Sequence, residues 1–174
     1  MSHSVVLSRA GIGLKAPLVK VEAHLSTGLP AFSVVGLPES SVRESRERVR
    51  SALICSHFKW PDRRITVSLA PAELPKGGGR FDLPIALAIL VASGQLSAST
   101  VVNREFFGEL GLDGSLRHCR GLLSAVQAAT LDQRAVILPA EQAKKMAVVP
   151  GSRVAAAGDL LSVCGLLKSK SLAV

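Results

Sequence analysis

The sequence is poor in aromatic residues. Phe, Trp and Tyr make up 3% of its 174 residues, with no tyrosine and a single tryptophan, Trp60. The core must therefore be built from Val, Leu, Ile and Ala. Proteins that hold single-stranded nucleic acid by stacking use exposed aromatic side chains as platforms for the bases. The composition therefore argues against recognition of that kind.

Cysteine is also scarce and shows no pairing pattern. Cys55, Cys119 and Cys164 are odd in number and widely spaced, and no C-x-x-C motif occurs. This pattern predicts neither a disulfide framework nor a zinc site, and it fits the reducing environment of the cytoplasm. No metal site is expected, because the histidines are scattered without a paired Asp or a second ligand: His3, His24, His57 and His118.

Two further absences narrow the function. The longest apolar run, 83–92, is about half the ~20 residues that a membrane span needs, and residues 1–9 lack the basic-then-apolar pattern of a signal peptide. No Gly-Lys pair occurs, so the G-x-x-x-x-G-K-[ST] loop that holds nucleotide phosphates is missing. We therefore expect no membrane contact, and no ATP site within these residues.

Positive charge is what the sequence has in excess. The formal net charge is +8 at pH 7. A basic balance favours acidic partners, with nucleic acid first among them. The alternative is a small basic domain without such a partner. The length suits one domain, residues 1–174, with a core of its own.

The first third of the chain indicates strands followed by a helix. Alternating apolar and polar residues predict strands at 4–14, 18–25 and 31–37, which we expect to form an antiparallel meander. Residues 38–57 carry apolar positions at helical spacing and predict an amphipathic helix. Its Arg46 and Arg50 have no obvious partner. They belong either to a solvated face or to a contact with DNA or a neighbouring subunit.

The rest of the chain is organised around residues 66–94. Residues 66–69 predict a strand, and 83–92 predict a helix that is apolar on every side and must be wrapped by other elements. Asp82 is the expected N-cap of this helix, and Gly94 is its expected C-cap.

The loop between this strand and this helix has two interpretations. One is an anion site at a helix N-terminus, comprising Lys76, Gly77, Gly78, Gly79 and Arg80. The other is a tight entry into the helix, for which glycines are needed in any case, with Arg80 paired to Asp82, Glu73 or Glu109. The sequence leaves both open.

The second half of the chain alternates strands and helices. Residues 105–118 predict a β-hairpin with a type I′ turn at Asp113-Gly114. Residues 121–130 predict a helix whose inward positions are Leu122, Leu123, Val126 and Ala129. There follow a strand at 135–138, a helix from Pro139, a strand at 153–157 and a helix from Asp159 to about residue 167. The basic tail, 168–174, looks cut rather than capped.

Three stretches, 28–53, 64–86 and 108–110, closely resemble the ComM/YifB family, often labelled magnesium-chelatase-like. Their most specific motif is L-P-K-G-G-G-R-F-D-L-P-I-A, and the resemblance extends from Ser4 onward. It implies one Lon-protease-like, ChlI-type N-terminal domain over 1–174, with the α/β (α+β) fold of ribosomal protein S5 domain 2 and a mixed sheet packed on helices. Residues from about 158 to 174 would form a C-terminal helix and a linker toward an AAA+ module outside this sequence.

The resemblance also implies a function. Full-length members form hexameric rings on DNA and act as ATP-driven helicases in branch migration, when incoming strands are integrated during natural transformation. ATP and Mg²⁺ are then expected on the AAA+ module, with no cofactor in this chain. We expect this domain to assist ring assembly and to guide DNA, with candidate contacts at Lys76, Arg80, Arg46 and Arg50. The alternative is a structural module that docks a partner protein without touching DNA.

The same resemblance bears on proteolysis. In Lon-type proteases a Ser attacks the peptide and a Lys activates it. The position of the Ser falls on Arg80, and the position of the Lys falls on Leu123. Arginine does not act as an acyl-forming nucleophile, and leucine does not accept a proton. We therefore expect no enzymatic activity from this chain.

Overall fold

The computed structural model describes residues 2–11, 14–74, 76–77 and 79–169. The strands of the main sheet are β1 (Ser2–Arg9), β2 (Leu18–Ser26), β3 (Ala31–Val35), β4 (Arg64–Ala70), β5 (Arg104–Phe106), β8 (Ala135–Pro139) and β9 (Val154–Ala157). A small separate pair comprises β6 (Glu109–Leu110) and β7 (Leu116–Arg117). The α-helices are α1 (Glu39–Cys55), α2 (Asp82–Ala92), α3 (Leu122–Leu131), α4 (Ala140–Met146) and α5 (Leu160–Lys168).

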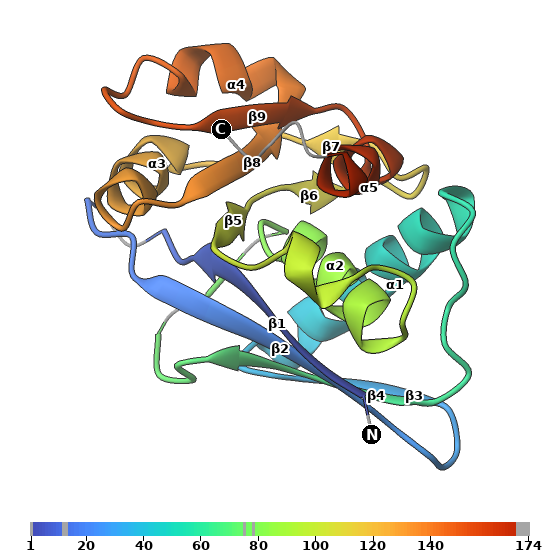
Figure 1. Ribbon diagram of the computed structural model, residues 1–174. Coiled ribbons are helices and arrows are strands. Elements are labelled where there is room, and N and C mark those ends of the chain that lie inside the picture. Colours follow the sequence, from blue (N-terminus) through green and yellow to red (C-terminus); the bar gives the residue numbers. More distant parts are fainter. Residues whose placement is uncertain (1, 12–13, 75, 78, 170–174) are drawn as a thin grey trace.

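The main sheet has seven strands in the order β3-β4-β2-β1-β5-β8-β9 (Figure 1). β2 is antiparallel to both β1 and β4, and the other neighbouring pairs are parallel. The mixed sheet packed on helices that the family resemblance implied is therefore confirmed. The first strand is shorter than expected, because β1 ends at Arg9.

The expected meander of the first three strands is wrong in its last step. β3 runs parallel to β4 at the edge of the sheet, and β4 separates β3 from β2. A parallel pair requires a crossover connection, and α1 supplies it between β3 and β4. The alternation of residues within β3 predicted a strand correctly, but it did not indicate which strand pairs with β3 in the sheet.

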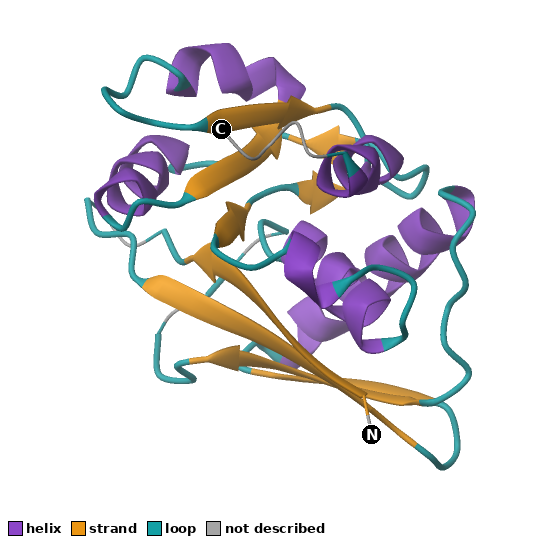
Figure 2. Ribbon diagram, viewed as in Figure 1, coloured by secondary structure: helices purple, strands orange, loops and turns teal. Residues whose placement is uncertain are grey.

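Helix α2 is buried, as its all-apolar composition predicted. The side chains from Leu83 to Leu90 are almost fully closed to solvent, and they form the centre of the main hydrophobic core. Figure 2 shows α1 and α2 on the same side of the strands β1, β2 and β4. Burial of apolar side chains contributes about 1.5–3 kcal/mol each, so α2 is held mainly by packing against these strands and α1.

The other half of the sheet is covered on both faces. Every residue of β8 is buried. Ile137 belongs to the main core, whereas Val136 and Leu138 pack in a second core with residues of α3 such as Val126. A strand buried on both faces is expected in a parallel sheet with helices on each side. This arrangement places α3 and α4 on the opposite face from α2 and α5.

Two local expectations in the second half are wrong. The hairpin comprises only β6 and β7, and its loop spans residues 111–115. Within this loop Gly114 has φ of +89°, whereas Asp113 has no positive φ. A type I′ turn would need positive φ at both central residues, so the loop is not of that type. In α3, Leu123 is 48% exposed and does not face the core.

The expected start of α5 is confirmed, whereas Ser93 holds the C-cap position of α2 and Gly94 comes directly after it. Gly94 follows α2 with φ of +79°, and its N–H donates to the Val91 carbonyl. The Asp159 side chain caps α5 by accepting from the Ser162 N–H at 2.7 Å. These short-range features were predictable because a capping residue acts within its own turn of helix.

Candidate functional site

The loop that leads from β4 into α2 is anchored on Gly108. The Gly108 N–H donates to the Arg80 carbonyl at 3.3 Å, and the Leu83 N–H donates to the Gly108 carbonyl at 3.1 Å. A Cβ on Gly108 would lie 2.2 Å from the Leu116 side chain, so this close approach requires glycine. The entry to α2, and with it Arg80, is thereby fixed beside the end of β5. Gly78 of the candidate anion site lies outside the described residues.

Asp82 is a buried ion-pair partner and not the expected N-cap. Phe81 holds the cap position, and Asp82 is the first residue of α2. Its carboxylate accepts from Arg48 Nε at 2.6 Å, the Ser45 hydroxyl at 3.0 Å and the Leu110 N–H at 3.2 Å. Burial raises the pKa of Asp82 to about 6, although these partners favour the charged form. The pair therefore joins α1 to the start of α2.

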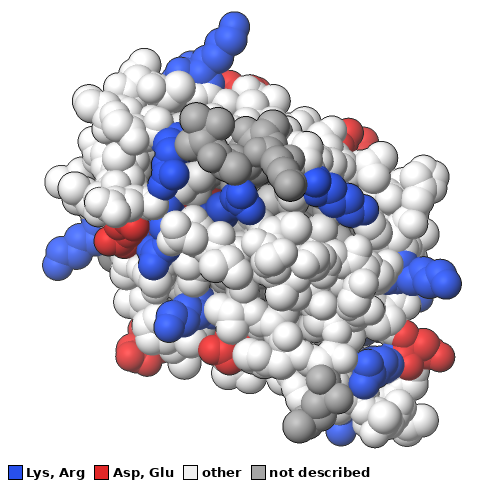
Figure 3. Space-filling view, viewed as in Figure 1, with Lys and Arg blue, Asp and Glu red and all other residues white. Residues whose placement is uncertain are grey.

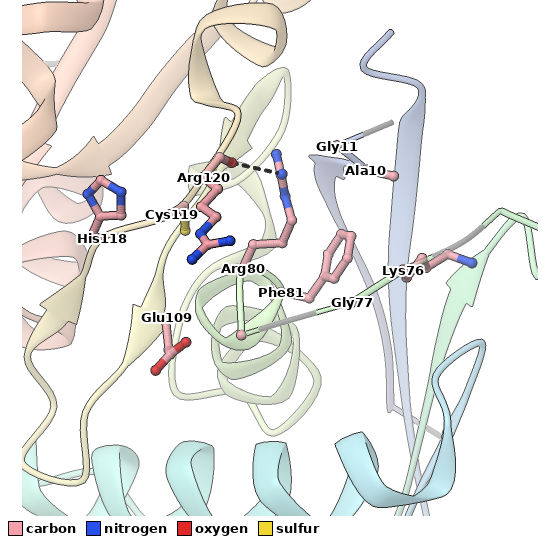
Figure 4. A pocket seen from close by; sticks show the side chains of 11 residues that line it. Ala10, Gly11, Lys76, Gly77, Arg80, Phe81, Glu109, His118, Cys119 and Arg120 are labelled. Carbon is pink, nitrogen blue, oxygen red and sulfur yellow. Dashed lines mark hydrogen bonds between the residues drawn. The ribbon is translucent and has the colours of Figure 1, made fainter. Parts of the chain in front are cut away.

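Lys76 is turned into its own loop. Its Nζ donates to the carbonyls of Pro71 at 2.5 Å and Leu74 at 3.1 Å, and the residue is 7% exposed. Burial lowers the pKa of Lys76, against the opposing effect of Glu73. Figure 4 shows its side chain pointing away from Arg80. The ammonium group therefore ties the loop together and does not face Arg80.

Arg80 is a largely buried cation with few partners. Its Nη1 donates to the Arg120 carbonyl at 3.1 Å, and its guanidinium carbon lies 5.7 Å from the centre of the Phe107 ring. Nε and Nη2 are buried without a hydrogen-bond acceptor among the described residues. Desolvation lowers the pKa of Arg80, with a small opposing effect from Cys119.

The expected ion pairs of Arg80 do not form. Asp82 is paired with Arg48, and neither Glu73 nor Glu109 makes an ion pair with Arg80 in the described part of the chain. The interpretation of the loop as a tight helix entry is supported by its anchoring on Gly108. The partners assigned to Arg80 in that interpretation are wrong.

Arg80 borders a cavity of about 480 Å³ (Figure 4). Three residues that follow β7 also line it: His118, Cys119 and Arg120. Reasoning from the sequence did not place them there, because no local pattern marks them and the β6–β7 hairpin carries them to the cavity. The remaining charged residues on its wall are Lys76 and Glu109.

A second, more apolar groove adjoins this cavity. It has a volume of about 690 Å³, and the two share Gly11, Lys76 and Gly77 on their walls. The groove is otherwise lined by Gly36, Leu37, Pro38, Ala72 and Leu74. The cavity and the more apolar groove therefore meet at Lys76 and Gly77 in the loop between β4 and α2.

On the described part of the cavity wall, Cys119 is not an activated nucleophile. Burial raises the pKa of Cys119 to about 11, and Arg80 lowers it only in part. A thiol with such a pKa is protonated at neutral pH and is a weak nucleophile. The backbone of Cys119 is held by Gln142, whose side chain accepts from its N–H at 2.9 Å and donates to its carbonyl at 2.7 Å.

The end of the Arg80 side chain lies close to the residue that precedes α3. A Cβ on Gly121 would lie 3.8 Å from Arg80 Nη1, and Gly121 precedes α3, which carries Leu123 in its first turn. The entry to α2 and the start of α3 therefore meet at Arg80.

Arg46 and Arg50 are exposed on α1 and make no ion pair with another described residue. On the face shown in Figure 3, Lys and Arg side chains are spread around the molecule with uncharged surface between them. Net charge alone therefore does not define a binding surface on that face.

Two classes of site find no support in the described residues. Across them, no three His, Cys, Asp or Glu side chains are grouped as a metal site would require. None of the helices in the described part of the chain has the length and apolar character of a membrane span.

This mixed α/β domain belongs to a recognised family. Residues 21–142 match the family model described as "Subunit ChlI of Mg-chelatase". The match covers more than half of the chain, so the chain belongs to this magnesium-chelatase-like family.

Individual relatives agree with this assignment. The chain is 49% identical over 170 residues to Competence protein ComM of Haemophilus influenzae, a match that covers 98% of this chain and 33% of that protein. It is 45% identical over 170 residues to YifB of Escherichia coli, which covers 98% of this chain and 34% of that protein. A Mycobacterium bovis protein is 41% identical over 140 residues, 80% of this chain and 28% of that protein. The chain thus spans about a third of the length of these relatives.

Proposed function

We propose that this chain is the N-terminal Lon-protease-like domain of a ComM-like hexameric AAA+ DNA helicase that acts in branch migration during natural transformation. The observation that carries the proposal is its identity of 49% with Competence protein ComM over 98% of the chain. ATP and Mg²⁺ would bind the AAA+ module in the remaining length of such a protein, which acts in the cytoplasm.

In this proposal the domain itself performs no catalysis. Arg80 and Leu123 stand where a Lon-type protease has its nucleophile and its activating lysine, and neither can take that role. The domain instead helps to assemble the ring and guides DNA. This is a binding role, which needs accessible charge more than an activated side chain.

Arg46 and Arg50 are the best-placed candidates for a DNA contact. They lie four residues apart on α1, so they occupy neighbouring positions on one face of the helix. Both are exposed, whereas Lys76 is buried in its own loop. Arginine side chains free of carboxylate partners are suited to phosphate contacts, which set the affinity for DNA without reading its sequence.

The test is fluorescence anisotropy of labelled single- and double-stranded DNA at about 50 and about 200 mM salt. Each phosphate contact contributes about −0.9 to the slope of log K against log salt for duplex DNA. The double substitution Arg46→Glu, Arg50→Glu should weaken binding at least about tenfold and make the slope less steep by about 2. The matched control is Lys144→Glu, Lys145→Glu, which changes the net charge equally at exposed positions of α4.

The structural docking module remains the competing function. It predicts no saturable DNA binding at low salt, or equal small effects of the two double variants. Because an isolated domain lacks the avidity of six linked copies, the titration is repeated with the full-length protein. Absence of an α1-specific effect in that setting would contradict the DNA-guiding role.

A further inference from the structure

The guanidinium group of Arg80 is largely buried, yet most of its N–H donors lack a hydrogen-bond acceptor in the described part of the chain. Nearly all buried polar groups in proteins have a hydrogen-bond partner, and an exception calls for a reason. Arg80 Nε and Nη2 have no acceptor among the described residues, and Nη1 has only the Arg120 carbonyl. Leaving a buried cation without an anionic partner is costly. Asp82, two residues along the chain, is already paired with Arg48.

The charged residues on the wall of the cavity add to this unpaired positive charge. The guanidinium groups of Arg80 and Arg120 lie on its wall against one acid, Glu109. Lys76 also lines it, but its ammonium group is held by two carbonyls of its own loop. In Figure 4 the Arg80 side chain points away from Glu109, with Arg120 beside it. The cavity is therefore suited to binding a small anion.

We propose that this cavity binds a phosphate monoester through Arg80 and Arg120. The Nε and Nη2 edge of an arginine is a rigid fork that matches two oxygens of one phosphate. A phosphate monoester carries close to two negative charges at neutral pH, which matches the two guanidinium groups of Arg80 and Arg120. A single carboxylate would satisfy only half of that charge.

The adjoining groove provides space for the organic group that is bonded to the phosphate. It meets the cavity at Gly11, Lys76 and Gly77, and its far wall includes Leu37, Pro38 and Leu74. An organic group bonded to the phosphate would lie on this apolar wall. Two sources have this chemistry, namely a free nucleoside monophosphate and the phosphorylated end of a DNA strand. The proposal does not rest on the DNA-guiding function, because a free nucleotide would satisfy it.

Binding requires a small movement of Arg80. Its free nitrogens are closed to solvent, so the guanidinium turns toward the cavity when the phosphate enters. This rotation sacrifices one hydrogen bond, to the Arg120 carbonyl, and gains charge-assisted bonds that are roughly twice as strong as neutral ones. The backbone does not need to move.

The first experiment is a titration at constant ionic strength, with thymidine 5′-monophosphate, inorganic phosphate and thymidine as probes. Calorimetry measures affinity, and the NMR signal of the Arg80 Nε–H reports the movement of the guanidinium. We expect the monophosphate to bind more tightly than inorganic phosphate, thymidine to show no binding, and the Nε–H signal to shift. Oligonucleotides with and without a 5′-phosphate then distinguish a strand end from a free nucleotide.

Substitutions locate the site. Arg80→Gln should weaken binding of the monophosphate at least about tenfold, the cost of about 1.4 kcal/mol or more, and Arg120→Gln should weaken it severalfold. Arg120 is exposed, so its substitution keeps the fold intact even where that of Arg80 does not. Lys144→Gln, at an exposed position of α4, is the control and should leave the affinity unchanged.

Two results would overturn the proposal. One is the absence of binding by both phosphate probes at millimolar concentration. The other is binding that is indifferent to Arg120→Gln and leaves the Arg80 signal in place. Failure of the DNA-guiding role is a separate outcome, because it is read from Arg46 and Arg50 on strands that lack a terminal phosphate.

Discussion

The Asp82 carboxylate lies at 1% exposure and depends on Arg48 for a partner of opposite charge. Removing one partner of a buried pair is far more destabilising than the pair itself is stabilising, because the remaining charge is left without compensation. The pair also joins α1 to α2, two elements that are separated by β4 in the chain. Its loss therefore affects both the core and the entry to the loop.

Arg48→Met should lower the free energy of unfolding by about 3–5 kcal/mol near neutral pH. Methionine keeps an apolar stem of similar length, so the loss reports the missing cation and not a missing stem. Urea unfolding followed by circular dichroism measures it. Arg46→Met on the exposed face of the same helix is the control, with an expected change within about 0.5 kcal/mol.

The cost of Arg48→Met should also depend on pH. The folded pKa of Asp82, about 6, lies above the ordinary value of 3.8. The folded state therefore binds this proton more tightly, and the contribution of Asp82 to stability falls as pH rises through the window from about 4 to about 6, by on the order of 3 kcal/mol. Without Arg48 the pKa rises further, so the substitution should cost more at about pH 8 than at about pH 5. Equal costs would show that Asp82 does not titrate in this range.

At the scale of elements, two glycines should respond in opposite ways to the same substitution. Gly36 follows β3 with φ of +101°, and a Cβ there would lie 2.7 Å from the Leu69 carbonyl oxygen. Gly36→Ala should therefore cost about 1–3 kcal/mol through backbone strain and displacement of β4. Gly165 lies within α5, and a Cβ there would meet no atom within 4 Å. Gly165→Ala should stabilise by about 0.5–1 kcal/mol because alanine favours a helix.

Thermal unfolding checks both changes, since 1 kcal/mol shifts the midpoint by about 2–4 °C in a domain of this size. The midpoint should fall for Gly36→Ala and rise for Gly165→Ala. A fall for both would mean that α5 is packed more tightly at Gly165 than the contacts around it indicate.

At the scale of the whole molecule, the sequence predicted what depends on neighbouring residues. The all-apolar composition of 83–92 identified a buried helix, and Asp159 identified the start of another. Each is encoded within one or two turns of helix, by periodicity or by a capping side chain. The resemblance to a known family, carried by a few long motifs, added the fold class and the family membership.

What the sequence did not predict depends on residues far apart in the chain. Asp82 was expected to cap its own helix but pairs with Arg48, which is 34 residues away. β3 was expected beside β2 but lies beside β4. His118, Cys119 and Arg120 reach the cavity only because the sheet and the hairpin bring them there. Tertiary contacts select among the arrangements that local patterns allow, and so a single sequence leaves them open.

The uneven covering of the sheet gives a final prediction. β8 is buried along its whole length. Among the described strands β3 lies at the edge of the sheet and pairs with β4 alone, and its Val35 is 54% exposed. Regions with fewer buried contacts open locally at lower free energy than the core. Native-state hydrogen exchange should therefore show the amides of β3 that bond to β4 exchanging at least about tenfold faster than those at the centre of β2, a difference of about 1.4 kcal/mol or more. If β3 and β2 exchange at the same rate under native conditions, the sheet opens as one cooperative unit, and the edge strand has no separate weakness.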